Sequence, residues 1–160
     1  MFYLGVMAMD LEQKATEIRV LGNGKSPIDL SLISHKLKLK VEKSRTISSL
    51  ISPDGNPQII LNSRKHIFQQ RVEWAHEIGH FVLHVGNQLL MPKSWTDKQE
   101  FEANRFSLYL LVTSEEIEEL IRPGIYRSHF TYEISRTLEV PLSFAAERLK
   151  LFENKVYNIW

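Results

Sequence analysis

Residues 71–84 have the sequence RVEWAHEIGHFVLH, and this stretch constrains how the rest of the chain must fold. It contains no proline and a single glycine, Gly79, so an unbroken helix over about residues 65–85 is predicted. His76 and His80 are four residues apart and therefore lie on one face of that helix. The other face is apolar and anchors the helix in a core; its members are Val72, Ala75, Ile78, Val82 and Leu83.

The two histidines and the glutamate after the first of them form a His-Glu-x-x-His pattern. Two imidazoles one turn apart can bind the same metal ion, at nitrogen–metal distances of about 2.0–2.1 Å. Glu77 follows the first histidine, where its carboxylate can act as a base on a water molecule, as in metalloproteases. The alternative interpretation is a solvated polar stripe, formed by Gln69, Glu73, His76, His80 and His84.

A third metal ligand must come from another part of the chain. His84 lies eight residues from His76, a rise of about 12 Å, so the three histidines cannot converge on one ion, and His84 is expected to support the site or line its rim. Glu100 and Asn104 share a helical face; we expect Glu100 to bind the metal and Asn104 to accept a hydrogen bond from a ligand imidazole. Glu102 lies about 200° around the same helix and cannot point to the same ion.

The rest of the chain predicts an α+β fold, a small antiparallel or mixed sheet of about three strands packed with several helices. Capping signals at Asp10, Thr96 and Thr113 mark helix starts, and Gly86-Asn87 marks a stop. The predicted helices span residues 10–21, 65–85, 97–112, 126–138 and 141–153, with a further helix from Pro27 and a short one between Thr113 and Pro123-Gly124. The predicted strands lie at residues 39–41, 47–51 and 58–61, with a turn at residues 53–57.

Composition narrows the class of protein. The 160 residues suit one domain, 1–160, in which residues 1–9 can be a loose tail. The net charge is +1 with no clustered basic patch, so direct nucleic-acid binding is not expected, and no apolar run is long enough for a membrane span. The chain has no cysteine, which excludes thiolate nucleophiles, disulfides and cysteine-ligated zinc and fits a reducing cytoplasm.

Two segments together resemble a known family. The run RVEWAHEIGHFVLH, followed by EFEANRF at residues 100–106, is similar to the ImmA/IrrE family of metallo-endopeptidases. The strand ending at Leu61-Asn62 and the segment VPLSFAAERL at residues 140–149 also resemble that family. The chain departs from the family pattern at Ser107, where alanine is usual, and at Leu111-Val112-Thr113, where Leu-Met-Pro is usual.

The resemblance implies a zincin-like core around one zinc ion, with ligands His76, His80 and Glu100 and with Glu77 as the catalytic residue. It also implies a protein or peptide substrate, because several family members cleave or inactivate helix-turn-helix repressors. Two His and one carboxylate suit zinc well. A second hypothesis is a non-catalytic regulatory binding module whose metal site is structural; a structural site would close its fourth position with protein.

Two further expectations concern the substrate. The oxyanion formed during hydrolysis needs a donor, and Tyr109, His84, Arg71 and Tyr126 are equivalent candidates on the sequence alone. The strand at residues 58–61 immediately precedes the histidine helix, so we expect its edge, at Ile59 and Ile60, to pair with an extended substrate.

Overall fold

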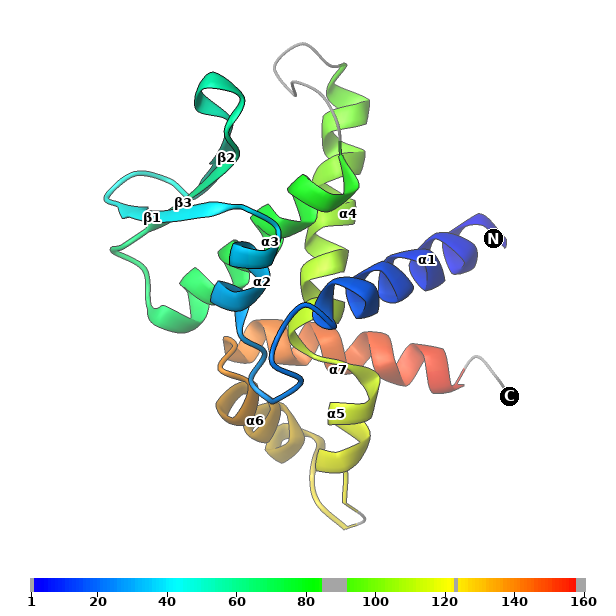
Figure 1. Cartoon of the computed structure of the whole chain (residues 1–160). Coiled ribbons are helices and arrows are strands. Elements are labelled where there is room, and N and C mark those ends of the chain that lie inside the picture. The colour runs from blue at the N-terminus through cyan, green and yellow to red at the C-terminus, as the bar shows by residue number, and fades with distance from the viewer. Residues whose placement is uncertain (1, 85–91, 123, 158–160) are drawn as a thin grey trace.

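The computed structural model describes residues 2–84, 92–122 and 124–157. Within them the fold is α+β, as the sequence predicts, with seven helices and a small mixed sheet (Figure 1). In chain order the elements are α1 (Phe2–Arg19), α2 (Leu30–Lys36), β1 (Lys40–Ser44), β2 (Ser49–Ile51), the 3-10 turn η1 (Pro53–Gly55), β3 (Gln58–Asn62), α3 (Ile67–Leu83), α4 (Lys93–Leu111), α5 (Ser114–Leu120), α6 (Arg127–Leu138) and α7 (Leu142–Tyr157).

The sheet has the strand order β1-β3-β2, with β1 parallel and β2 antiparallel to β3. Ile59 of β3 pairs with Val41 on one side and with Leu50 on the other. Ile59 and Leu61 are fully buried, so the face of the sheet on which they lie packs into the core.

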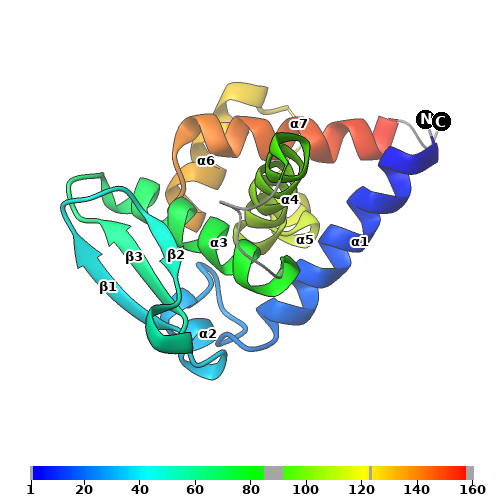
Figure 2. The same cartoon turned by 90° about the horizontal axis from the view of Figure 1, so that it is seen from above.

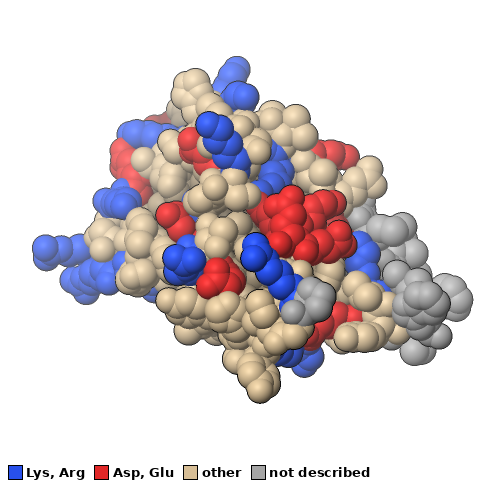
Figure 3. All heavy atoms as spheres, turned by 90° about the horizontal axis from the view of Figure 1, so that it is seen from below, with Lys and Arg blue, Asp and Glu red and all other residues tan. Residues whose placement is uncertain are grey.

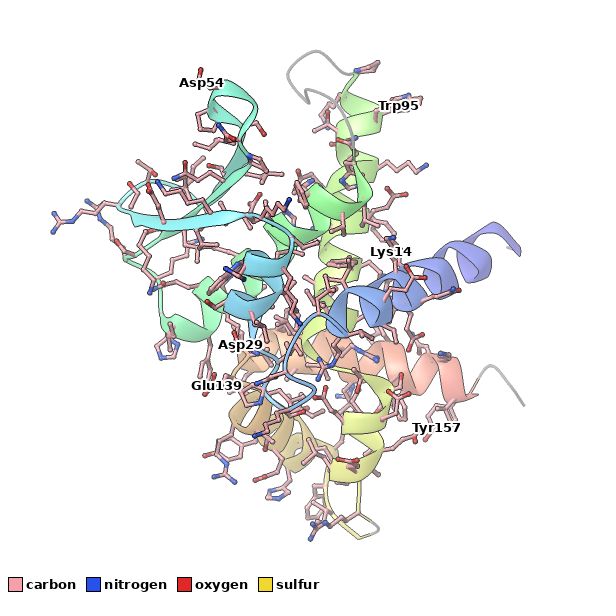
Figure 4. All side chains as sticks on the ribbon, in the orientation of Figure 1. Lys14, Asp29, Asp54, Trp95, Glu139 and Tyr157 are labelled. Carbon is pink, nitrogen blue, oxygen red and sulfur yellow. The ribbon has the colours of Figure 1, made fainter. Side chains whose placement is uncertain are left out.

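The central position of β3 corrects the expectation that Ile59 and Ile60 form the substrate-receiving edge. Both residues pair with a neighbouring strand on each side, so β3 has no free edge over this stretch. The cause is the turn η1, in which Asp54 and Gly55 adopt positive φ angles of 52° and 78° and fold β2 back onto β3. Asp54 lies at the tip of this turn (Figure 4). Among the strands that the structure describes, the outer edges of the sheet therefore belong to β1 and β2.

The helix α3 stands between the sheet and the other large helices. Seen from above, the sheet lies on one side of α3, and α4, α7 and α1 lie on the other (Figure 2). The helix α4 packs against α3 on one side and α1 on another, which places it in the middle of the helical layer. Buried apolar residues from all three meet there, including Ala15, Ile78 and Phe106.

Several helix boundaries differ from the prediction. The backbone of α1 is helical from Phe2 rather than from Asp10. The helix α2 begins at Leu30 rather than at Pro27, because the side chain of Asp29 accepts a hydrogen bond from the Leu32 N–H at 2.9 Å and caps it. The helix α4 begins at Lys93, so Thr96 lies inside it instead of capping it.

Other local predictions hold or cannot be compared. The capping box of Thr113 and Glu116 is confirmed, with both reciprocal hydrogen bonds present. The predicted stop at Gly86-Asn87 lies outside the described residues.

The surface around α5 is acidic. In the view from below, acidic side chains gather in the middle of the face, where α5 lies (Figure 3). The exposed members on α5 are Glu115, Glu118 and Glu119. None of the described helices combines the length and the apolar composition that crossing a membrane requires.

Candidate metal centre

The helices α3 and α4 run antiparallel where they meet, and their contacts step along both helices together. His76 contacts Asn104, and His80, one turn later on α3, contacts Glu100, one turn earlier on α4. The spacing of four residues on each helix therefore brings complementary side chains face to face.

Gly79 allows the two helices to approach closely. A Cβ atom at this position would lie 3.0 Å from Cδ1 of Phe106 and 3.3 Å from the Cα atom and carbonyl oxygen of Ala103. Two of those contacts are to backbone, which cannot move aside as a flexible side chain can. The glycine within the His-Glu-x-x-His pattern thus sets the distance between the helix that carries the histidines and the helix that carries the carboxylate.

His76, His80 and Glu100 form the candidate metal-binding group. The two histidine Nε2 atoms lie 2.9 Å apart, and the Glu100 carboxylate oxygens lie 3.3 Å from His76 Nε2 and 3.1 Å from His80 Nε2. Donor atoms about 2.0–2.1 Å from a tetrahedral ion stand roughly 3.3 Å from one another, so these separations fit one ion. The donor set, two imidazoles and a carboxylate, suits a transition-metal ion.

The outer nitrogen atoms of both histidines have partners that orient the rings. His76 Nδ1 lies 2.9 Å from the Asn104 side-chain oxygen, to which it can donate its hydrogen. His80 Nδ1 lies 3.2 Å from His84 Nδ1, and His84 Nε2 lies 3.0 Å from Glu102. An ionised Glu102 carboxylate has no hydrogen to donate and can only accept a hydrogen bond from His84. His84 therefore carries its hydrogen on Nε2 and accepts a hydrogen bond from His80 through Nδ1. In that tautomer Nε2 of His80 carries the lone pair that can bind a metal ion, and it faces Nε2 of His76 and the carboxylate of Glu100.

The structure thus separates the two carboxylates of the α4 segment. Glu100 lies with His76 and His80, whereas Glu102 lies against His84 and 3.7 Å from the ammonium of Lys98. His84 itself is the C-cap residue of α3 and adopts an extended conformation, with φ −121° and ψ 138°. It is therefore beside the metal-binding group without belonging to it.

Glu77 is buried next to this group and only 8% exposed. The pKa of its carboxyl group is raised to about 7. Burial is the largest cause, a hydrogen bond from the main-chain N–H of Leu50 opposes it, and the nearby charges of Glu100 and Glu73 add to it. Burial, with a further contribution from His76, lowers the pKa of His80 to about 4. A neutral imidazole is the form that binds a metal ion.

Leu50 is a member of the site that the sequence does not reveal. It belongs to β2, and its contact with Glu77 exists only because the sheet packs against α3. No spacing or motif in the sequence relates residue 50 to residue 77, so a prediction of this contact requires the strand order.

Three of the four candidate oxyanion donors are placed elsewhere. Tyr109 is buried beneath the guanidinium of Arg148, and Tyr126, 86% exposed, is the N-cap residue of α6. Arg71 donates to the carbonyl oxygen of Ile28. Of the four candidates, His84 alone contacts the metal-binding group, through His80.

A comparison with known protein families identifies the chain's relatives. The profile of the M78 peptidase family, described as the IrrE N-terminal-like domain, matches residues 28–150. The chain belongs to the ImmA/IrrE family. The match runs from the residue before the Asp29 cap of α2 into α7, so it includes every residue of the metal-binding group and leaves α1 outside.

Two proteins of Bacillus subtilis (strain 168) are similar to this ImmA/IrrE family member. The phage-like element PBSX protein XkdA is 30% identical over 132 residues, which are 82% of this chain and 66% of XkdA. The uncharacterized protein YqaB is 27% identical over 129 residues, 81% of this chain and 74% of YqaB. The chain therefore spans slightly less than two thirds of the length of XkdA.

Proposed function

We propose that this ImmA/IrrE family member is a zinc-dependent endopeptidase that cleaves a regulatory protein, such as a helix-turn-helix repressor. The observation that carries the proposal is that a possible metal site and a buried carboxyl group lie side by side. His76, His80 and Glu100 form a group that can hold one metal ion. Beside it lies Glu77, a buried carboxyl group whose pKa of about 7 suits the exchange of protons at neutral pH.

The chemistry divides between the ion and the protein. Zinc, when bound, supplies a Lewis acid that lowers the pKa of water and polarises a carbonyl group. Glu77 takes the proton from the attacking water and later delivers it to the leaving amine. Asn104, and His84 with Glu102 behind it, hold the two imidazoles in the orientation that metal binding requires.

The free edge of β2 is the surface we propose for the substrate main chain. Leu50 pairs with Ile59 on one side of β2, and its N–H bonds to Glu77. This strand lies beside the proposed catalytic carboxylate, and its outer edge pairs with no other described strand. Its main-chain groups other than the Leu50 N–H, which bonds to Glu77, are the ones we propose for the substrate. An extended peptide can add to such an edge through main-chain hydrogen bonds, which fix its register independently of side chains.

A regulatory target is supported by the relatives rather than by the geometry. XkdA is a protein of a phage-like element, and the resemblance to the ImmA/IrrE family implies a repressor as target, because several of its members act on repressors of mobile elements or stress genes. The alternative of a binding module with a structural metal site requires a fourth protein ligand. Among the described residues, the metal-binding group has three members.

The test combines metal content with proteolysis of co-expressed repressors. We expect Glu77→Gln to bind zinc in the parent stoichiometry and to lose turnover by at least about a hundredfold, because it removes the base and keeps the ligands. His76→Ala should lose both zinc and turnover. Parent-rate cleavage by Glu77→Gln would overturn the mechanism, and stoichiometric zinc in His76→Ala would overturn the ligand assignment.

The strand edge has its own variant in the same assay. Leu50→Pro removes the N–H that bonds to Glu77 and obstructs pairing along β2. We expect it to retain zinc and to lose turnover, with the fold checked by circular dichroism. Cleavage at the parent rate by a folded Leu50→Pro protein would remove β2 from the substrate-binding surface.

A further inference from the structure

A cavity of about 370 Å³ lies beside the metal-binding group, one helical turn away on both helices. Val72 lines it from α3 and lies four residues before His76. Leu108 lines it from α4 and lies four residues after Asn104, which itself lies four residues after Glu100. A helical turn rises about 5.4 Å, so the cavity begins where the metal-binding group ends. Asn104 connects the two, because it lines the cavity and contacts His76 of the metal-binding group.

Apolar atoms make up slightly more than half of the cavity walls. Val72, Phe101, Leu108 and Phe144 contribute apolar side chains from three different helices. Ser107 also lines it, but its hydroxyl donates to the main-chain oxygen of Asn104 at 2.7 Å and is thus satisfied within α4. Ser107 is one of the two departures from the family pattern, and its hydroxyl is therefore not an unpaired donor facing a ligand.

The two charged residues of the lining have opposite signs. Arg105 places its guanidinium over the ring of Phe101, with 5.2 Å between the guanidinium carbon and the ring centroid. Glu147 reaches the cavity from α7 and is exposed. A positive and a negative group on one small cavity favour neither an anionic nor a cationic occupant. The size of the cavity falls in the range of small-molecule sites, which combine apolar walls with a few polar groups.

We propose that this cavity is a specificity pocket that receives a large apolar side chain, such as leucine, methionine or phenylalanine, of a polypeptide next to the scissile bond. The proposal rests on the proposed peptidase function, and it names the side-chain class that the site selects. Because Asn104 lines the cavity and contacts His76, the side chain in the cavity would belong to a residue within one or two positions of the scissile carbonyl group. Burial of an apolar side chain in such a pocket is worth a factor of about 10 to 200 in selectivity per methylene-sized change.

The first experiment measures binding and does not depend on catalysis. The probes are N-acetyl amides of phenylalanine, leucine, aspartate and lysine, titrated into the full chain with and without zinc and followed by methyl NMR. We expect the phenylalanine and leucine amides to shift the Val72 and Leu108 methyl signals saturably, and the aspartate and lysine amides to leave them unchanged. No saturable shift, or a preference for a charged amide, overturns the pocket.

Matched variants locate the binding. Val72→Trp fills the cavity and should weaken binding of the phenylalanine amide at least about tenfold. Val82→Trp makes the same change on α3 at a position that is not part of the lining, and should leave affinity unchanged. Glu147→Trp narrows the cavity from an exposed position and should also weaken binding of the phenylalanine amide. It replaces Val72→Trp as the test if that variant does not fold. Equal affinities in all folded variants would overturn the assignment.

The second experiment separates this inference from the proposed function. Peptides that differ in the residue on either side of the scissile bond are incubated with the zinc-loaded chain. A preference for a large apolar residue that shifts to small residues in Val72→Trp supports both conclusions. Amide binding without cleavage of any peptide leaves the pocket standing and rejects the peptidase. Cleavage without an apolar preference rejects the pocket and leaves the peptidase standing.

Discussion

At the scale of single residues, Glu77 is held where its charged form is disfavoured. Its carboxyl group is 8% exposed, and burial raises its pKa from 4.5 to about 7. Between these two values the folded chain keeps a proton that the unfolded chain releases. The contribution of Glu77 to the free energy of unfolding is therefore fully present below pH 4.5 and is lost as the pH rises through about 7. The fold carries this cost at the position where the proposed reaction needs a proton acceptor.

Because the charged form of Glu77 destabilises the fold, we predict that Glu77→Gln raises the free energy of unfolding of the metal-free protein, by an amount that increases with pH. Glutamine has nearly the same shape and no charge, so the variant should gain stability relative to the parent on the order of 3 kcal/mol between pH 4.5 and pH 8. Urea unfolding of both proteins in the presence of a chelator measures the difference at each pH. The same difference at both pH values would show that Glu77 has an ordinary pKa.

Residue-scale features differ in how far the sequence reveals them. Helical periodicity predicts that His76 and His80 share one helical face and that Glu100 and Asn104 share another, because residues four apart lie on one face whatever the rest of the fold does. That the two faces meet depends on the packing of α3 against α4. The role of Leu50 does not follow, because it depends on which strand lies at the edge of the sheet. The oxyanion candidates were indistinguishable for the same reason, since their distances from the metal-binding group are set by tertiary packing.

At the scale of elements, the contact between α3 and α4 is as decisive as the ligands themselves. The predicted existence and order of the helices hold, whereas the predicted ends of α1, α2 and α4 and the predicted edge position of β3 do not. Strand order depends on the turn η1 and on long-range pairing, neither of which periodicity encodes. Helix ends depend on single caps, and the side chain of Asp29 caps α2 two residues after Pro27, where the helix was expected to begin.

Gly79→Ala should weaken the contact between these two helices. In an isolated helix, alanine is more favourable than glycine by about 1 kcal/mol, so propensity alone predicts a gain in stability. We expect a loss instead, together with weaker zinc binding, because the new methyl group would lie 3.3 Å from the backbone of Ala103 and would separate α3 from α4. Calorimetric unfolding and zinc titration check the two effects. A variant that is more stable and binds zinc as the parent does would contradict this account of Gly79.

At the scale of the whole molecule, a metal ion held between α3 and α4 joins two parts of the chain that are far apart in sequence. Binding to the folded chain alone stabilises it by about 2.7 kcal/mol at a free concentration one hundred times the dissociation constant. For a chain of this size we expect zinc to raise the melting temperature by about 5 to 10 °C.

Two glutamate variants test which carboxylate contributes to this stabilisation. Glu100→Gln should lose most of the zinc-dependent rise in melting temperature, because it removes a donor from the metal-binding group. Glu102→Gln is the matched control, two residues away on the same helix, and should retain most of the rise because it alters only the partner of His84. A larger loss in Glu102→Gln would reverse the assignment of the third ligand.

The placement of α1 has a consequence for how members of the family can diverge. It lies before the segment that matches the family, yet it packs along α4, the helix that supplies Glu100. Arg19 of α1 donates to the main-chain oxygen of Leu110 at 2.6 Å and pairs with Glu116, which ties α1 to the end of α4. Substitutions in a helix outside the family match can thus adjust the tilt of the helix that supplies Glu100. Metal affinity can therefore change through substitutions of residues that do not contact the metal ion.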